Sequence, residues 1–444
     1  HMFTNRMIRN LLVPVVLEQI LNSIMGTADT MMVSNVGSAA LSAVSLVDSI
    51  NVLLIQAFSA LAAGGAIVCA QYIGQRNYEK ANMSARQVLF IITAISVVVS
   101  AVCLIFQKPL LRLIFGAVDA DVMRASEIYF FFTALSFPFI AAYDSAASIF
   151  RAQENTKGPM TISMISNIMN IGGNAILIFV LGMGVEGAAI STLVSRIFCA
   201  IVVIWQLRND NAPICIRNYF SIRPDWYLIK KILFIGIPSG IENSMFQFGK
   251  LAIQSTVSTL GTVAIAAQAM TNILENLNGI AAIGIGIGLM TVVGQCLGAG
   301  RKDEAIYYIK KLSWLSEAVI IASCLLVFAL TKPITMLAGM EPASAKLCFF
   351  MISFITIVKP VSWVLSFIPP YGMRAAGDVK FSMITSCCTM WLCRVSLCIY
   401  LCRVWGFGPI AVWIGMFSDW TLRAIIFSIR FHSRKWLNHR VIEK

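Results

Sequence analysis

Long apolar stretches alternate with short polar stretches along the whole chain. An α-helix rises 1.5 Å per residue, so about 20 apolar residues cross the hydrocarbon core of a bilayer. Twelve stretches meet this length, and two of them are long enough to extend beyond the lipid (42–74 and 264–298). The pattern therefore predicts an all-α polytopic membrane protein, with spans at 11–35, 42–74, 88–107, 127–150, 160–182, 185–207, 232–258, 264–298, 312–331, 346–373, 381–403 and 406–429.

The composition agrees with this interpretation. Of the 444 residues, 58% are hydrophobic and 12% are charged, whereas a soluble domain carries about 25% charged residues. The net charge of +13 comes mainly from arginine and lysine that follow the even-numbered spans and end the chain at Lys444. Cytoplasmic loops carry such an excess, so both termini are expected to be cytoplasmic. Orientation in the membrane accounts for the charge, and no nucleic-acid partner is expected.

Motifs that carry enzyme chemistry are missing from the sequence. It contains no GxxxxGK[ST], HExxH or GxSxG motif, and its three histidines lie outside the predicted spans. The 12 cysteines lie mostly in apolar runs without paired CxxC spacing, so neither a disulfide framework nor a zinc site is expected. His1-Met2 resembles an expression scar, and the apolar run that follows is too long for a signal peptide. We expect neither an enzyme nor a cofactor.

An internal repeat organises the chain. Pro14 and Pro238 are 224 residues apart, and the same shift pairs many other positions. An even number of spans returns each half to its starting side, so the two six-helix copies are expected to be parallel, around a central cavity. The predicted domains are an N-terminal bundle (1–207), a cytoplasmic linker (208–231) and a C-terminal bundle with a short cytoplasmic tail (232–444). Further pairs are Glu18 with Glu242, Gly37 with Gly261, Gly64 with Gly288, Gln71 with Gln295, Gly74 with Gly298 and Pro109 with Pro333.

The first span carries an unusual polar stripe. At about 100° per residue, Glu18, Asn22 and Asp29 are expected to share one face of the helix. A charge inside a membrane span costs roughly 2.5–3.5 kcal/mol even on the mild insertion scale. The stripe is therefore predicted to face a partner or a water-filled cavity in a transport pathway. The alternative is a buried hydrogen-bonded cluster with a structural role.

Other spans add polar residues to the first half. Asn167, Asn170 and Asn174 share a face of the fifth span, where such side chains line a pathway or join helices. Asp48 and Asp144 are either pathway acids or helix-end residues.

The second half carries a different set of charges. At the position equivalent to Asp29 it has Ile253. The pair Asp419 and Arg423, spaced i,i+4, is most simply structural. Two cations, Lys359 and Arg394, are expected to neutralise Glu242 or Glu275, or to meet an anionic part of a substrate.

Several motifs together resemble the multidrug and toxic compound extrusion (MATE) family, in a prokaryotic form, over essentially the whole chain. They are Pro14…Asp29-Thr30…Gly37…Ala43, Gln71-Tyr-Ile-Gly74, Gln295-Cys-Leu-Gly298-Ala-Gly, Phe150-Arg-Ala-Gln-Glu-Asn-Thr-Lys157-Gly-Pro-Met, Gly184-Val-Glu-Gly-Ala-Ala189 and Arg423…Arg430-Phe…Lys435-Trp436. The resemblance implies two bundles around a central cavity. It also implies export of amphiphilic, often cationic compounds in exchange for H⁺ or Na⁺.

The resemblance also implies which residues couple transport to the ion. The proton-linked branch uses an acid on span 1, an Asn and an acid on span 5, and a Thr on span 6. Asp29, Asn170 and Thr192 match these positions, but Asn174 replaces the second acid. Another branch uses acids on spans 7 and 10, where this chain has Phe246 and no carboxylate in 346–373. The predicted coupling set is thus Asp29, Glu18, Asn22, Asn170, Asn174 and Thr192, with Na⁺ placed at Asp29, Asn170 and Asn174.

The predicted substrates are small, cationic amphiphiles held by Glu242, Phe246, Met25, Glu275 and Arg394, because methionine and aromatic contacts suit promiscuous binding. The protein is expected to be a monomer in the bacterial cytoplasmic (inner) membrane, in contact with its lipids. A flippase for lipids or lipid-linked precursors is one alternative. A channel or a receptor is another, from a different class.

Overall fold

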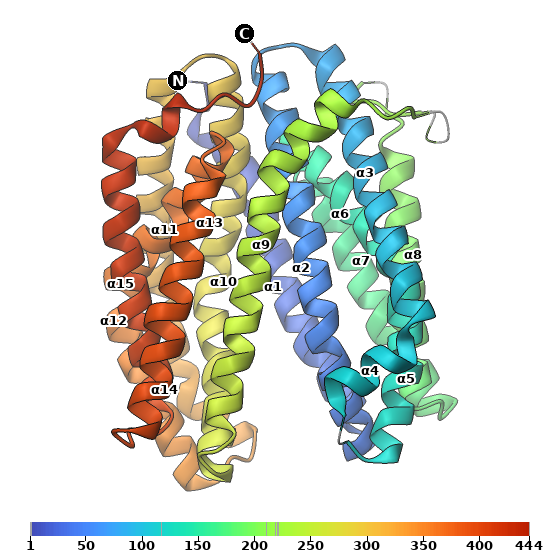
Figure 1. Ribbon diagram of the computed structural model, residues 1–444, viewed down its shortest axis with the longest axis vertical. Coiled ribbons are helices and arrows are strands. Elements are labelled where there is room, and N and C mark those ends of the chain that lie inside the picture. The colour runs from blue at the N-terminus through green and yellow to red at the C-terminus, as the bar shows by residue number, and fades with distance from the viewer. Residues whose placement is uncertain (1, 117, 210, 218, 220–221, 444) are drawn as a thin grey trace. The chain divides into compact units, whose positions relative to one another are not determined.

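The computed structural model describes residues 2–116, 118–209, 211–217, 219 and 222–443. His1 and Lys444, assigned above to a scar and to the basic end of the chain, lie outside these residues. Contacts divide the chain into two compact units. We call them the N-unit (Leu21–Gly240) and the C-unit (His1–Ile20 with Ile241–Lys444). Each is built from long helices (Figure 1).

Helices cover all six predicted spans of the first repeat. Gly37, with φ at 147°, starts the second helix in a conformation that residues with a side chain rarely adopt. The fourth span is a pair of helices bent by 42°, with Pro138 in the first turn of the second one. The elements are α1 (Asn5–Ser34), α2 (Ser38–Gly74), α3 (Tyr78–Ile105), α4 (Gln107–Phe115), α5 (Ala120–Leu135), α6 (Phe137–Ala152), α7 (Lys157–Asn174), η1 (Ala175–Val180) and α8 (Val185–Gln206).

The second repeat has the same order of spans. Gly261, the equivalent of Gly37, again has a positive φ, at 98°, before the second helix. The elements are α9 (Trp226–Val257), α10 (Thr262–Gly298), α11 (Lys302–Leu337), α12 (Pro342–Ala375), α13 (Val379–Thr389), η3 (Met390–Val395), α14 (Ser396–Arg403), α15 (Ile410–Ser433) and η4 (Lys435–Asn438).

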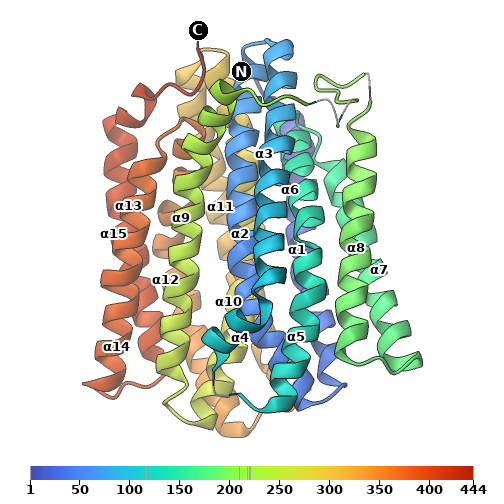
Figure 2. The same cartoon turned by 45° about the vertical axis from the view of Figure 1, so that its right-hand side comes forward.

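These helices confirm the predicted fold class. Within the described ranges, 10 helices are long and apolar enough to cross a membrane, and the bent pair α5–α6 makes an eleventh span. Helix α9 has 32 residues and covers the remaining predicted span, but Glu242, Asn243 and Lys250 make it more polar. Residues 2 and 443 lie at the same end of the C-unit (Figures 1 and 2), as expected if the number of crossings is even.

The compact units do not coincide with the sequence repeats. Helices α1 and α9 are each divided between the two units, with one half in the N-unit and the other half in the C-unit. Glycines explain this exchange. A Cβ atom on Gly64 of α2 would lie 2.7 Å from the backbone of Gly236 in α9. A Cβ atom on the equivalent Gly288 of α10 would lie 2.3 Å from Leu12 in α1. The first helix of each repeat therefore packs its first half against the second helix of the other repeat.

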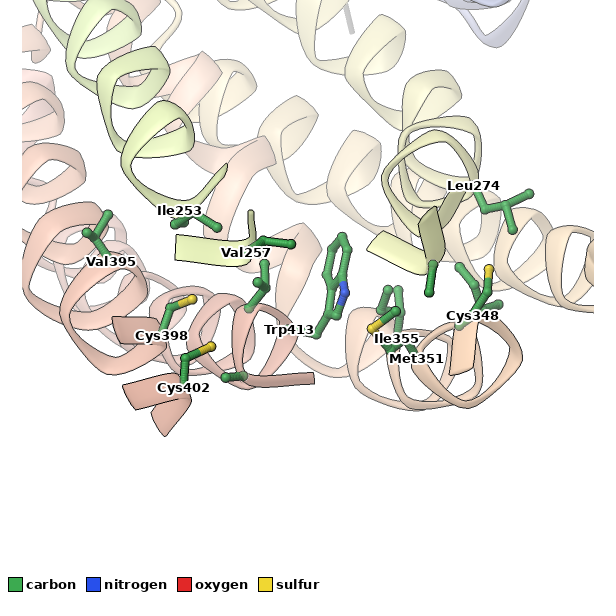
Figure 3. Close-up of a cluster of buried hydrophobic side chains, with 14 of the residues drawn as sticks. Ile253, Val257, Leu274, Cys348, Met351, Ile355, Val395, Cys398, Cys402 and Trp413 are labelled. Carbon is green, nitrogen blue, oxygen red and sulfur yellow. The ribbon is translucent and has the colours of Figure 1, made fainter. Parts of the chain in front are cut away.

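An apolar cluster fills the C-unit at the position where the N-unit carries its carboxylate (Figure 3). Ile253, the repeat equivalent of Asp29, is buried there with Val257 of the same helix. Trp413 of α15 closes the cluster and donates an indole N–H to Gln268 Oε1 at 3.0 Å. The two repeats thus differ at this position: one buries an aliphatic side chain where the other holds an acid.

Candidate functional site

Asp29 is held by amides of helix α7 in the N-unit. Its Oδ1 atom accepts a hydrogen bond from Asn170 Nδ2 at 3.3 Å and another from Asn174 Nδ2. The i,i+4 spacing places both amides on one face of α7. Among the described residues, no Lys, Arg or His lies within ion-pair distance of Asp29, and Arg196 acts on it only at longer range. The carboxylate is therefore held by neutral groups.

Asn22 makes the same connection two turns earlier. Its Oδ1 accepts hydrogen bonds from Ser163 at 2.8 Å and from Asn167 at 2.6 Å. Asn22 and Asp29 thus form two polar contacts between α1 and α7. Glu18 is buried at 3% exposure and belongs to the C-unit. Its proposed part in coupling stays a prediction.

The hydroxyl that reaches Asn170 is not the predicted one. Thr192 donates to Ala188 O of its own helix at 3.1 Å. Ser191 instead donates to Asn170 O at 2.7 Å and to Asn170 Oδ1 at 3.1 Å. A step of one residue turns a side chain by about 100° around the helix. Helices α7 and α8 lie side by side (Figure 2). Gly173 permits this close approach to Ser191, because a Cβ atom at position 173 would lie 2.5 Å from Ser191 Oγ. This glycine was the sequence signal for the contact with Ser191, and sequence reasoning missed it.

We expect Ser191→Ala to slow transport about fivefold, because a hydrogen bond that positions Asn170 is worth about 1 kcal/mol. Thr192→Val removes a hydroxyl that bonds within its own helix and should cause a smaller loss. Initial rates of substrate uptake into everted vesicles would measure both. A larger defect in the Thr192 variant would contradict the assignment of Ser191.

Two more aspartates lie within the N-unit helices, not at their ends. Tyr129 donates its hydroxyl to Asp48 Oδ1 at 3.1 Å, and Ser59 donates to Asp144 Oδ2 at 3.1 Å. Arg196 interacts electrostatically with Asp48, Asp144 and Asp29, and its Nη1 donates to Ser136 at 2.7 Å. Three carboxylates thus act on a single guanidinium. Sequence reasoning left the two aspartates open and missed Arg196.

In the C-unit, Glu242 is enclosed. It is 8% exposed and pairs with Arg374 at 3.2 Å. Ser386 and Ser382 donate to its carboxylate at 2.7 and 3.3 Å. The predicted contact between Glu242 and a cation of the spans is therefore made by Arg374 rather than by Lys359 or Arg394.

Lys359 and Arg394 each have a carboxylate of their own. Lys359 pairs with Glu275 at 2.9 Å, as predicted. Arg394 pairs with Asp419 at 3.2 Å and not with either glutamate. Asp419 and Arg423 are both buried and interact electrostatically, but Arg423 makes its hydrogen bonds to Ser366 at 3.1 Å and to Ser386 at 2.5 Å. Spacing along α15 could not reveal that a side chain from η3 reaches Asp419 first.

The remaining predicted substrate residues fall in different units. Phe246 lies in the C-unit with Lys250 Nζ 4.8 Å and the Arg394 guanidinium 5.0 Å from its ring centroid. Met25 lies half-buried in the N-unit part of α1. A metal centre of three or more His, Cys, Asp or Glu does not occur within the described residues.

Two stretches of the chain, 14–176 and 238–400, each match the family model MatE. The chain belongs to the MATE family. It is 26% identical to the uncharacterized transporter YisQ of Bacillus subtilis over 96% of this chain and 93% of that protein. It is 23% identical to the "Probable multidrug resistance protein NorM" of Thermotoga maritima over 98% and 93%.

Solved structures agree on the fold. A crystal structure of MATE in complex with MaD3S superposes with a TM-score of 0.87 at 19% identity, over 96% of this chain and 95% of that one. The predicted family and the helical fold with two repeats are thus confirmed. The MATE family is a family of multi-pass membrane transporters and not a class of enzymes.

Proposed function

We propose that this MATE protein is a secondary antiporter that exports small amphiphilic molecules and that Asp29 binds and releases the coupling cation. The observation that carries the proposal is a carboxylate in a membrane span with two neutral amides as its hydrogen-bond donors. A fixed salt bridge would hold Asp29 ionised in every state. Amides stabilise its charge less, so a cation can neutralise it at moderate cost.

We propose H⁺ as that cation. Both amides turn their nitrogens toward Asp29, as donors to a charged carboxylate do. Asn174 Oδ1 is buried without a hydrogen-bond donor among the described residues. Protonation gives Asp29 an O–H donor, and a rotated Asn174 amide then accepts it. The Asn174 amide can therefore hydrogen-bond to Asp29 in both of its protonation states. Binding of Na⁺ by Asp29, Asn170 and Asn174 is the alternative to this proposal.

The proton on Asp29 then selects between states open to opposite sides of the membrane. Charged Asp29 favours contact with α7, and neutral Asp29 frees the second half of α1. Pro14 lies in the first half of the same helix, where a backbone hydrogen bond is already missing. The excess of basic loops supports cytoplasmic termini in a bacterial inner membrane, and we propose a monomer.

Dye transport in proteoliposomes tests the proposal. With the membrane potential clamped at zero, exchange of one proton per substrate against a pH difference of one unit yields about tenfold accumulation. A sodium gradient alone should drive none. Accumulation under sodium alone would exclude H⁺, and flux without any accumulation would indicate a channel. Binding without flux would indicate a receptor. Faster transfer of a fluorescent lipid than of a dye would indicate a flippase.

A further inference from the structure

Two cations share one aromatic ring in the C-unit. Lys250 of α9 and Arg394 of the π-helical turn η3 both lie over Phe246, at 4.8 and 5.0 Å from the ring centroid. Gly249 lies against the side chain of Met390 at the start of η3, where a Cβ atom would approach the Met390 methyl group to 2.4 Å. Such π-helical turns are frequent at functional sites. The face of α9 that carries Phe246 and Lys250 is therefore held against the turn that carries Arg394.

The carboxylates near this pair are already engaged. Asp419 pairs with Arg394 at 3.2 Å, and Glu275 pairs with Lys359 at 2.9 Å. Lys359 is 1% exposed and also donates to Asn278 at 2.5 Å, so its ammonium group is enclosed by these partners. Lys250, Arg394 and Lys359 thus face two carboxylates, and Arg423, which also interacts with Asp419, adds another positive charge. Positive charge is therefore in excess around Phe246.

Lys250 contributes to this excess without a carboxylate of its own among the described residues. Its side chain is exposed, and no described carboxylate lies within ion-pair distance of its ammonium group. Its charged neighbours are Glu275 and Arg394. Glu317 of α11, a further acid of this unit, is not among them. An unpaired charge in a span costs roughly 2.5–3.5 kcal/mol, and such groups are usually functional.

This arrangement is the opposite of what a cationic substrate needs. Glu242, the acid expected to hold it, is enclosed by Arg374 and two serines. A cation near Phe246 would be repelled by Lys250 and Arg394, whereas an anionic group would offset part of the excess positive charge. The ring of Phe246 holds the two cations close together and so concentrates positive potential.

We propose that the C-unit binds the anionic group of an amphiphilic substrate through Lys250, with Arg394 and Phe246 fixing the position of the ammonium. This assignment rests on the antiporter function proposed above and names its substrate class: anionic amphiphiles in place of the cationic ones predicted from the resemblance. Lys250 is the binding residue, and Arg394 is a positioning residue.

Riboflavin and riboflavin 5′-phosphate are suitable probes, because they share one fluorescent ring system and differ by a phosphate. Fluorescence titration of the full-length protein in detergent should show that the phosphate-bearing probe binds on the order of tenfold more tightly, as expected for one hydrogen bond to a charged group. Lys250→Gln should abolish this preference, and Lys250→Arg should keep most of it.

Lys332 supplies the matched control. It is also an exposed lysine of the C-unit over a phenylalanine ring, 4.9 Å from the centroid of Phe349, but it lies near the end of α11. Lys332→Gln should retain the preference for the phosphate-bearing probe. Preserved melting curves of the Lys250 variants would exclude unfolding as the cause of the loss.

Equal affinity for the two probes in the wild type would overturn the assignment, as would a preference that survives in Lys250→Gln. Tighter binding of ethidium than of either flavin would restore the cationic class. The titration needs no ion gradient, so it is independent of coupling. Failure of Asp29 to couple transport would leave the phosphate preference intact, and Asp29→Asn should bind both probes like the wild type.

Discussion

We expect Asp29→Asn to reduce gradient-driven accumulation of substrate to a ratio of about one, whereas the wild type should reach about tenfold at a pH difference of one unit. The asparagine keeps the size of the side chain and can still meet Asn170 and Asn174 of α7. It carries no titratable proton, so the exchange loses its driving step. Substrate affinity, measured by titration without a gradient, should stay within about twofold.

Asp121→Asn is the control for the loss of an acid. Asp121 lies exposed in the first turn of α5, outside the predicted span, and this variant should accumulate substrate as the wild type does. Tenfold accumulation by Asp29→Asn would remove Asp29 from the mechanism. A loss of accumulation together with a loss of binding would point to a substrate contact at Asp29 and not to a coupling role.

Asp419→Asn lowers the stability of the protein by about 3–5 kcal/mol, the largest such effect that we expect of a single substitution. Asp419 and Arg394 are each 1% exposed and pair at 3.2 Å. Removal of the carboxylate leaves a buried guanidinium without its counter-charge, and that unpaired charge is what destabilises the fold. Denaturant or thermal unfolding in detergent measures the loss.

The double variant Asp419→Leu/Arg394→Met removes both charges and should recover most of that stability, because a buried ion pair and an apolar pair of similar volume are often equivalent. Arg301→Gln is the control at an exposed pair. Arg301 meets Glu304 at 3.2 Å with 55% of its side chain exposed, and its loss should cost less than about 1 kcal/mol. If the double variant instead loses as much stability as the two single variants together, an unpaired buried charge is not the cause of the destabilisation.

The membrane topology could be predicted from the sequence because it depends on local properties. Hydropathy over about 20 residues decides whether a segment enters the lipid. The repeat could be detected because glycines and prolines are needed wherever backbones turn or approach closely, as at Gly37 and Gly261. Asp29 stood out for the same local reason: a carboxylate in an apolar helix is costly wherever that helix packs.

Pairing between helices depended on the tertiary structure. Periodicity placed Asn170 and Asn174 on one face of α7, but the rotation of α8 decided that Ser191 and not Thr192 meets Asn170. Spacing along α15 suggested a partner for Asp419, but η3 brings Arg394 to it. These contacts depend on angles and distances between helices that are far apart along the chain.

The sequence by itself determined the membrane-spanning class, the duplication and the polar stripe of the first span, because each follows from the chemistry of neighbouring residues. Only the tertiary structure decided which charges are neutralised. It paired Glu242, Glu275 and Asp419 with cations and left Lys250 beside Phe246 without an acid within ion-pair distance among the described residues. The physical reason is that the energy of a charge in a membrane depends on the atoms within a few ångströms of it, and folding chooses those atoms.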